Sequence, residues 1–199
     1  MPMGVRTATE DDLGALTETM ATAFLTDPVW GAYSFPDAGT RSHASRRFWE
    51  FYLRAAMRLA ATFVTPGCEA AAVWVPPGEA ELTADQEVGF ADLVADLVGR
   101  EQARVVLGAF DRLDEAHPHD EPHWYLSLLA THTGHRGRGL GMGLLGACLE
   151  TVDAAHLPAY LESTNPGNDA RYRRLGFEPA GLVVLPGEVP VTTMWRPAR

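Results

Sequence analysis

The chain has 199 residues and a formal net charge of −10, and its composition, 46% hydrophobic and 21% charged, is typical of a globular protein. The acidic balance argues against a nucleic-acid partner, because phosphate-binding domains present a basic face. It would suit a small cationic ligand, although solubility is the more common reason for an acidic composition. No apolar run approaches the roughly 20 residues of a membrane span, and we find no leader, linker or cysteine framework. We therefore expect one cytoplasmic domain over residues 1–199, with no membrane partner.

The first half of the chain alternates helical and strand patterns. The predicted elements are a strand (5–7), a helix (9–24), a second helix (41–61) and a two-stranded hairpin (62–78). Thr9 is a suitable N-cap for the first helix, which carries acidic residues in its first turn. The loop between the helices holds Trp30 and Tyr33, which could form a lid over a ligand or a clamp onto the core. Cys68 and Cys148 are predicted as core residues.

The second half repeats the alternation with longer elements. The predicted elements are two helical stretches (89–99 and 106–113), a strand (124–131), a helix (140–156), a strand (158–162), a short helix (168–175) and two strands (178–185 and 191–196). The turn HPHDEPH (117–123) contains three histidines. No acidic or cysteine partner completes a recognisable zinc spacing around them, so we predict no metal site.

The stretch HRGRGLGMGLL (135–145) follows a predicted strand and opens a helix. Glycines and arginines in that position can present free backbone N–H groups and a positive helix end to a phosphate, although a tight turn alone would also use glycines. A Walker loop is excluded because the chain has no lysine. The dinucleotide fingerprint at Gly141, Gly143 and Gly146 begins too far from the strand, and only 37 residues follow Glu162, too few to complete a doubly wound sheet.

The spacing of Arg136, Gly139 and Gly141 resembles the Arg/Gln-x-x-Gly-x-Gly/Ala signature of the GNAT superfamily of acyl-CoA-dependent N-acyltransferases. A second region, with Asn168 and Tyr172 before the sequence RRLGF, is similar to the other signature of that family. The order of the predicted elements resembles the family from end to end. The stretches AAVWVPP, HPHDEPHWYLSLLA and PAYLESTNPGNDARYRRLGF are most similar to members that acetylate the aminonucleoside puromycin, whereas residues 24–40 match them poorly.

The resemblance implies an α+β fold. In that fold a central mixed, mostly antiparallel sheet of about seven strands carries helices on both faces, and the sheet is splayed between strands 4 and 5. It also implies acetyl-CoA as cosubstrate. The residues expected to bind it are Leu129, Ala130 and Thr131 along the strand, Arg136, Gly137, Arg138, Gly139, Leu140 and Gly141 in the loop, and Asn168.

The resemblance places Tyr172 beside the departing sulfur, where a phenol could act as the acid; a core tyrosine on the short helix is the alternative. Glu162, at the end of its strand, is the candidate base or ammonium-binding group, and a role in anchoring the core stays open for it. His132 is the second candidate base. Trp30, Tyr33 and Trp124 are expected to line the substrate pocket with His132.

These observations favour an acetyl-CoA-dependent N-acetyltransferase that acts on the primary amine of a small molecule, such as an aminonucleoside antibiotic, and so confers resistance. Two alternatives stay open: acetylation of a peptide or protein N-terminus, and a non-catalytic acyl-CoA sensor. The intact Tyr172 and Glu162 speak against the sensor, because a binding module has no use for a proton donor. The oligomeric state is undetermined, a homodimer included.

Overall fold

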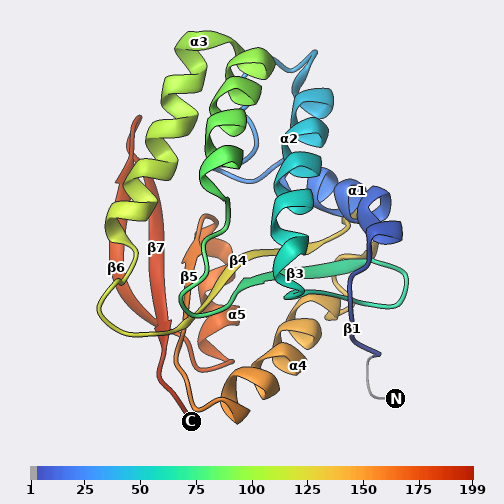
Figure 1. Cartoon of the computed structure of the whole chain (residues 1–199), viewed down its shortest axis with the longest axis vertical. Helices are drawn as coiled ribbons and strands as arrows, with labels where there is room; N and C mark the ends of the chain where they lie inside the picture. Colours follow the sequence, from blue (N-terminus) through green and yellow to red (C-terminus); the bar gives the residue numbers. More distant parts are fainter. Residues whose placement is uncertain (1–3) are drawn as a thin grey trace.

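The computed structural model describes residues 4–199 and contains one seven-stranded sheet (Figure 1). The strands are β1 (Arg6–Thr7), β2 (Thr62–Val64), β3 (Ala70–Val75), β4 (Trp124–Thr131), β5 (Ala159–Ser163), β6 (Glu178–Leu185) and β7 (Val189–Arg196). Their order across the sheet is β1-β2-β3-β4-β5-β7-β6. Only β4 and β5 run parallel, and the other neighbouring pairs are antiparallel. The predicted mixed, mostly antiparallel sheet is confirmed.

Helices cover both faces of the sheet, as expected. They are α1 (Leu13–Phe24), α2 (Arg41–Ala56), α3 (Ala84–Ala116), α4 (Leu140–Ala154) and α5 (Asp169–Arg173), with 3₁₀ turns at Glu10–Asp12, Met57–Leu59, Thr133–His135 and Pro166–Asn168. Buried side chains of α1, α2 and α3 pack on one face of β3 and β4, and those of α4 pack on the other. None of the helices within residues 4–199 combines the length and apolar character of a membrane span.

Several boundaries differ from the predicted ones for local reasons. The first helix opens with a 3₁₀ turn, where the Asp12 carboxylate accepts hydrogen bonds from the Thr9 backbone at 2.8 Å and from its hydroxyl at 3.1 Å. The second helix stops short of the predicted residue 61, because Ala60 adopts the left-handed conformation with φ 51°. The two predicted helical stretches after the hairpin form α3, which breaks at Gly99.

The loop after α1, for which the sequence allowed a lid or a clamp, packs into the core. Trp30 is 7% exposed and Phe35 is 2% exposed. The Trp30 ring lies 5.0 Å from that of Phe110 and 6.0 Å from that of Trp49, measured between ring centroids. This loop therefore joins α2 and α3 to the end of α1.

β4 and β5 pair at only two positions, Trp124 with Ala159 and Tyr125 with Tyr160. Beyond Tyr125, β4 remains paired with β3 on one side, and β5 remains paired with β7. A bulge at Ser127 lets Leu126 and Leu128 face consecutive residues of β3, which shifts the side-chain alternation of β4. The predicted splay between the fourth and fifth strands is confirmed, and it leaves one edge of residues 126–131 without a partner strand.

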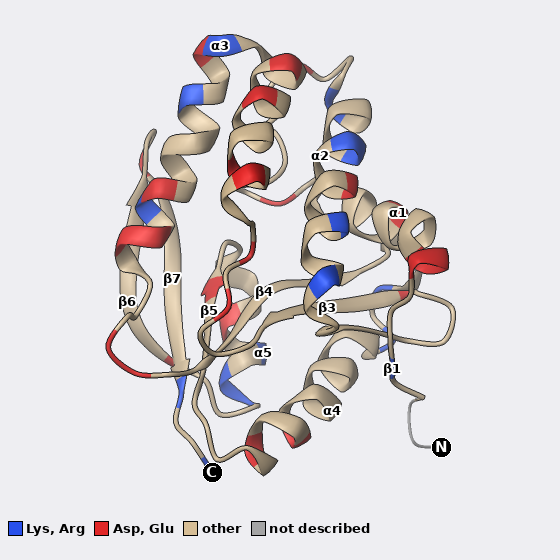
Figure 2. Ribbon diagram, viewed as in Figure 1, with Lys and Arg blue, Asp and Glu red and all other residues tan. Residues whose placement is uncertain are grey.

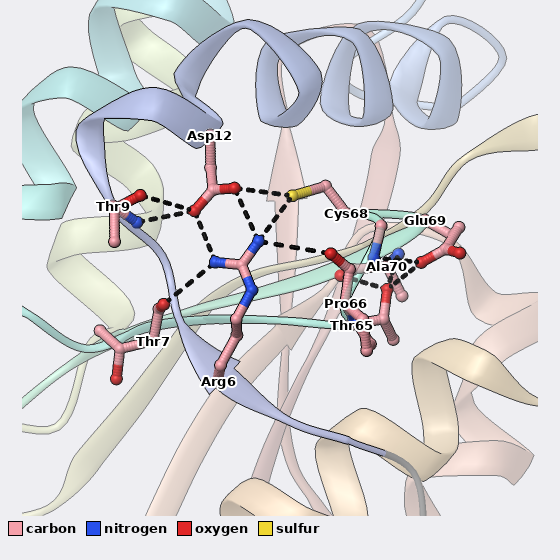
Figure 3. Close-up of polar contacts among 10 residues, drawn as sticks. Arg6, Thr7, Thr9, Asp12, Thr65, Pro66, Cys68, Glu69 and Ala70 are labelled. Atoms are coloured by element: carbon pink, nitrogen blue, oxygen red, sulfur yellow. Dashed lines mark hydrogen bonds and ion pairs between the residues drawn. The ribbon is translucent and has the colours of Figure 1, made fainter.

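An ion pair near the N-terminus ties β1 to the 3₁₀ turn that opens α1, and the same arginine reaches the turn between β2 and β3 (Figure 3). Arg6 donates to both carboxylate oxygens of Asp12, at 2.6 and 2.7 Å, and to the Pro66 carbonyl at 3.4 Å. The Arg6 guanidinium holds the pKa of Asp12 below its usual range. Cys68 is buried beside this pair, and burial raises the pKa of its thiol, in keeping with its predicted role in the core.

A second, more buried ion pair fixes β7 to the end of α4. Arg196 is 2% exposed. Its guanidinium donates to Asp153 at 2.6 and 2.9 Å and to the Leu175 carbonyl at 2.9 Å. Because Asp153 is the negative partner of a buried cation, removing its charge leaves the Arg196 guanidinium buried without a counter-charge.

We predict that Asp153→Asn lowers the free energy of unfolding at pH 7 by about 1.5–3 kcal/mol, toward the lower figure because the carboxylate is one-third exposed. Arg196 lowers the pKa of Asp153, so this contribution is complete above the unfolded pKa of about 4 and is lost as pH falls through the lower folded value. Urea unfolding at pH 7 and near pH 3 measures the difference. The exposed Glu150→Gln on the same helix is the control and should behave as wild type; a gap that stays constant down to acid pH would contradict this prediction.

Candidate functional site

Two neighbouring cavities lie along β4 at the splay. The smaller, of about 550 Å³, is lined on β4 by Leu129, Ala130 and Thr131. The larger, of about 920 Å³, is lined on the same strand by Tyr125, Ser127 and Leu128. The loop after α1 contributes to both, with Asp27 in the smaller cavity and Trp30 in the larger. β4 and the loop after α1 therefore contribute residues to both cavities.

The glycines of residues 135–141 let the chain pass close to the end of β4. Gly137 and Gly139 have φ values of 79° and 77°, a left-handed conformation that favours glycine. Gly141 opens α4 against β4, where a Cβ atom would lie 2.5 Å from Oγ1 of Thr131. The first N–H groups of a helix have no partners within it, and Gly139, Leu140 and Gly141 line the smaller cavity. This geometry suits an anion such as a phosphate.

The sequence-predicted ligand-binding residues largely gather in the smaller cavity. Its lining includes Leu129, Ala130, Thr131, Arg136, Gly137, Gly139, Leu140, Gly141 and Asn168. Arg138 is not among the lining residues and donates toward Nδ1 of His135 at 3.0 Å. Arg136 is held in place by donating to the carbonyl of Ala23, at the end of α1, at 2.6 Å.

Tyr172 extends from α5 into the lining of the smaller cavity. Burial raises the pKa of its phenol, and the nearby carboxylates of Asp27 and Asp169 raise it further. The hydroxyl therefore keeps its proton at neutral pH and is available as a donor.

Asp27 lies at the boundary of the two cavities, and sequence reasoning gave it no role. It accepts backbone hydrogen bonds from Val29 at 2.9 Å and Trp30 at 3.1 Å, and the hydroxyl of Thr164 donates to it at 2.9 Å. Burial raises the pKa of this carboxyl. Asp27 therefore joins the loop after α1 to the segment that follows β5.

The larger cavity combines an aromatic floor with acidic walls. The aromatic side chains are those of Trp30, Trp49, Tyr52, Phe90, Phe110 and Tyr125. Eight carboxylates line it: Glu79, Glu81, Glu87, Asp111, Asp114, Asp120, Glu121 and Glu162. No arginine of the described chain lines it. Figure 2 shows acidic residues, in red, along α3 and on the segments before and after it. Such a cavity attracts a cation and offers flat apolar surfaces beside it.

Glu162 and Glu81 are two carboxylates of this cavity with buried oxygen atoms. The side chain of Glu162 is 5% exposed, and its Oε1 lies 3.8 Å from Nδ1 of His117. Burial, together with the Glu162 charge, raises the pKa of Tyr125. The Oε1 atom of Glu81 is buried without a hydrogen-bond partner in the described residues, and burial raises the pKa of its carboxyl. The hydroxyls of Ser127 and Tyr52 interact with this carboxyl and partly offset the effect of burial.

Three sequence-predicted substrate residues line neither cavity. The phenol oxygen of Tyr33 is buried in the protein interior, and its backbone carbonyl accepts a hydrogen bond from the side-chain amide of Gln102 at 2.6 Å. Trp124 packs edge-on against Trp74 on the face covered by α4. His132 accepts at Nδ1 from the backbone of Gly134, at 3.1 Å. Trp30 does line the larger cavity.

Sequence reasoning missed Glu81, Tyr125 and Ser127, because the segment holding Glu81 has no periodicity and the bulge that turns Ser127 leaves no local signal. For the histidines of residues 117–123, the sequence predicted no metal site and indicated no other role. Across residues 4–199, no group of three or more His, Cys, Asp or Glu side chains is arranged to hold a metal ion.

Comparison with known proteins adds a family model, described as the acetyltransferase (GNAT) family, that matches residues 67–177. The structure of "histone acetyltransferase HPA2 and related acetyltransferase" from Corynebacterium glutamicum is 26% identical, with a TM-score of 0.73 over 100% of this chain and 98% of that one. An apo variant of agmatine N-acetyltransferase is 18% identical, with a TM-score of 0.65 over 98% and 99% of the two chains. The NatC complex bound to Gag peptide and CoA matches at 12% identity, with a TM-score of 0.53 over 100% of both chains. The last two similarities show the fold alone.

We predict that Gly141→Ala lowers the free energy of unfolding by about 1–3 kcal/mol, because its Cβ would meet Thr131 and push α4 from β4. Gly146→Ala on the same helix is the matched control, since a Cβ there meets nothing within 4 Å, and it should be neutral or stabilising by up to about 1 kcal/mol. Urea unfolding measures both. The cost of Gly141→Ala should shrink in a Thr131→Ala background, and an equal cost in both backgrounds would disprove the proposed contact.

Proposed function

The chain belongs to the GNAT acetyltransferase family, and from that premise we propose that it transfers an acetyl group to the primary amine of a small cationic molecule. As an N-acetyltransferase it takes the acetyl group from acetyl-CoA. The observation that carries the choice of acceptor is the larger cavity, with its eight carboxylates and aromatic floor. Its volume of about 920 Å³ is within the range of pockets for drug-sized ligands, about 300–1,000 Å³.

An aminonucleoside such as puromycin is the acceptor that we infer within this class. The aromatic floor offers stacking surfaces for a base, and the acidic walls suit the attached amine. Deprotonating an α-amino group of pKa near 8 costs about 1.4 kcal/mol at pH 7, whereas a lysine-like amine near 10.4 costs about 4.6 kcal/mol. Acetylation would remove the charge of such an antibiotic, so we propose resistance as the biological role. We place the reaction in the cytoplasm, because Cys68 and Cys148 are both free.

The smaller cavity fits acetyl-CoA in its chemistry. The unpaired edge of Leu129, Ala130 and Thr131 offers backbone groups to the pantetheine amides, as an added strand would use them. The N–H groups of residues 136–141 and the Arg136 guanidinium suit the pyrophosphate. The space that a Cβ at Gly141 would fill is already taken up by β4, so the loop lies close to the strand. Arg138 would add charge from outside the cavity, and Asn168 would close the opposite wall.

When bound, acetyl-CoA supplies a thioester carbonyl that an uncharged amine can attack. Glu162 holds the substrate ammonium from the larger cavity. Backbone N–H groups of the unpaired β4 edge stabilise the negative charge that develops on the carbonyl oxygen. Tyr172 donates its proton to the sulfur from the smaller cavity.

Protons and bonds balance along this path. The ammonium loses one proton before its nitrogen bonds to the acetyl carbon. As the carbon–sulfur bond breaks, the sulfur takes the proton of Tyr172, and the new amide nitrogen releases a second proton that returns to the phenolate through water. One proton goes to solvent for each amide formed. Because the pKa of Tyr172 is raised, equilibrium at neutral pH favours return of the phenolate to the protonated phenol.

Release of free thiol from acetyl-CoA tests the proposed acceptor across a panel of puromycin, an aminoglycoside, spermidine and a short peptide. We expect puromycin to be the best substrate by at least tenfold in kcat/KM. Preference for the peptide would instead support an N-terminal acetyltransferase. Tight binding of acetyl-CoA without thiol release for any amine would support the sensor and overturn the proposed reaction.

We predict that Tyr172→Phe lowers kcat at least tenfold while the KM for acetyl-CoA changes less than threefold, because only the proton donor is removed. Thiol release with the best amine of the panel measures both constants. Tyr33→Phe is the matched control, since Tyr33 lines neither cavity and contacts none of the proposed catalytic groups. An unchanged kcat in Tyr172→Phe would assign the acid to another group.

A further inference from the structure

The turn between α3 and β4 places two histidines in line with Glu162 at the wall of the larger cavity. Nδ1 of His123 lies 2.7 Å from the carbonyl oxygen of Glu121. Nε2 of His123 lies 3.0 Å from Nε2 of His117, and Nδ1 of His117 lies 3.8 Å from Oε1 of Glu162. The sequence motif that contains these histidines has no part in the mechanism given above.

The backbone carbonyl of Glu121 fixes the direction of every hydrogen bond in this row. A carbonyl can only accept, so Nδ1 of His123 carries a hydrogen. Burial lowers the pKa of His123, which keeps its ring neutral and leaves Nε2 as an acceptor. Nε2 of His117 must then be the donor in the contact between the two rings. In a neutral His117 the lone pair is therefore on Nδ1, the atom nearest Glu162.

His117 Nδ1 and the Glu162 carboxylate are thus two acceptors 3.8 Å apart, and neither can satisfy the other. A nitrogen at a hydrogen-bond distance of about 2.8–3.0 Å from both atoms fits between them. A substrate ammonium carries the two or more N–H donors that this pair lacks.

We propose that His117 is the catalytic base, that Glu162 shares the substrate ammonium with it, and that His123 is a positioning residue that holds His117 in the accepting tautomer. This inference rests on the proposed function. The ammonium gives its first proton to Nδ1 of His117, which becomes an imidazolium and later releases that proton to solvent. Glu162 stays negative throughout and keeps hold of the amine.

The surroundings of His117 hold the ring in place and meet its positive charge. The rings of Tyr125 and Tyr160 each lie 4.8 Å from it, at 82° and 73°. The titratable and charged groups facing it are Glu162 and Tyr160 on β5, Tyr125 on β4, Asp114 at the end of α3, Glu81 before α3, and His119, Glu121 and His123 in the turn. The carboxylates among them outnumber the other charges. His132, the second base that the sequence offered, lines neither cavity.

Nitrogen-15 NMR of the histidine rings in the whole protein tests the geometry without any acetyl transfer. We expect the Nε2–H tautomer for His117 and the Nδ1–H tautomer for His123 at a pH where both are neutral. In His123→Phe, which keeps a ring in this aromatic contact, His117 should show a mixture of tautomers. A wild-type His117 with its hydrogen on Nδ1 would overturn the proposal.

The pH dependence of kcat/KM with the best amine of the panel tests the chemistry. Wild type should lose activity on the acid side as His117 takes up a proton. In His117→Gln we expect kcat/KM to fall about 100-fold or more and the acid limb to disappear. His123→Phe should lose about tenfold, with the KM for acetyl-CoA unchanged. Glu115→Gln, at the exposed end of α3 two residues before His117 and outside the cavity lining, should change kcat/KM less than threefold.

The outcomes separate this inference from the proposed function. No thiol release from wild type with any amine overturns the proposed function and this inference with it. Release that persists with an unchanged acid limb in His117→Gln overturns this inference alone. Loss of activity in His117→Gln with equal loss in Glu115→Gln would show that this end of α3 has only a structural role, and would also overturn the inference.

Discussion

The parting of β4 from β5 is the constraint on which the rest of the molecule depends. Two paired positions at Trp124 and Tyr125 hold the strands together, and β4 then continues without β5 for residues 126–131. Backbone groups left unpaired inside a protein are costly unless water or a ligand satisfies them. The open edge is therefore a place where a ligand can complete the sheet, and both cavities lie along it.

The two cavities have opposite electrostatic character although they share one strand. The smaller presents Arg136 and the N-terminus of α4, which favour an anion. The larger presents eight carboxylates, which favour a cation. The two cavities would therefore attract reactants of opposite charge to successive stretches of the same strand, and hydrogen bonds from Val29 and Trp30 to Asp27 hold the loop that contributes to both cavities. This division limits binding of either reactant in the wrong cavity.

The sequence predicts what is encoded locally. Helical and strand periodicities located the main elements, and the glycines near Gly139 predicted a sharp turn from β4 to α4. The larger cavity is a different case, because α3 turns back on itself at Gly99. Glu81 just before α3 and His117 just after it thereby line the same cavity as Glu162 of β5. No local pattern encodes that return. For the same reason the positions of Tyr33 and Trp124 outside both cavities could not be read from their aromatic character.

Separating the binding of the amine from the acceptance of its proton resolves a conflict within the larger cavity. A carboxylate holds an ammonium because it is negative, so a carboxylate that took the proton would lose its attraction for the amine at the moment of attack. A neutral imidazole 3.8 Å away can take the proton and leave the carboxylate charged. The resulting imidazolium lies beside that same carboxylate, and the attraction between the two opposite charges offsets part of the cost of charging a ring that is 21% exposed.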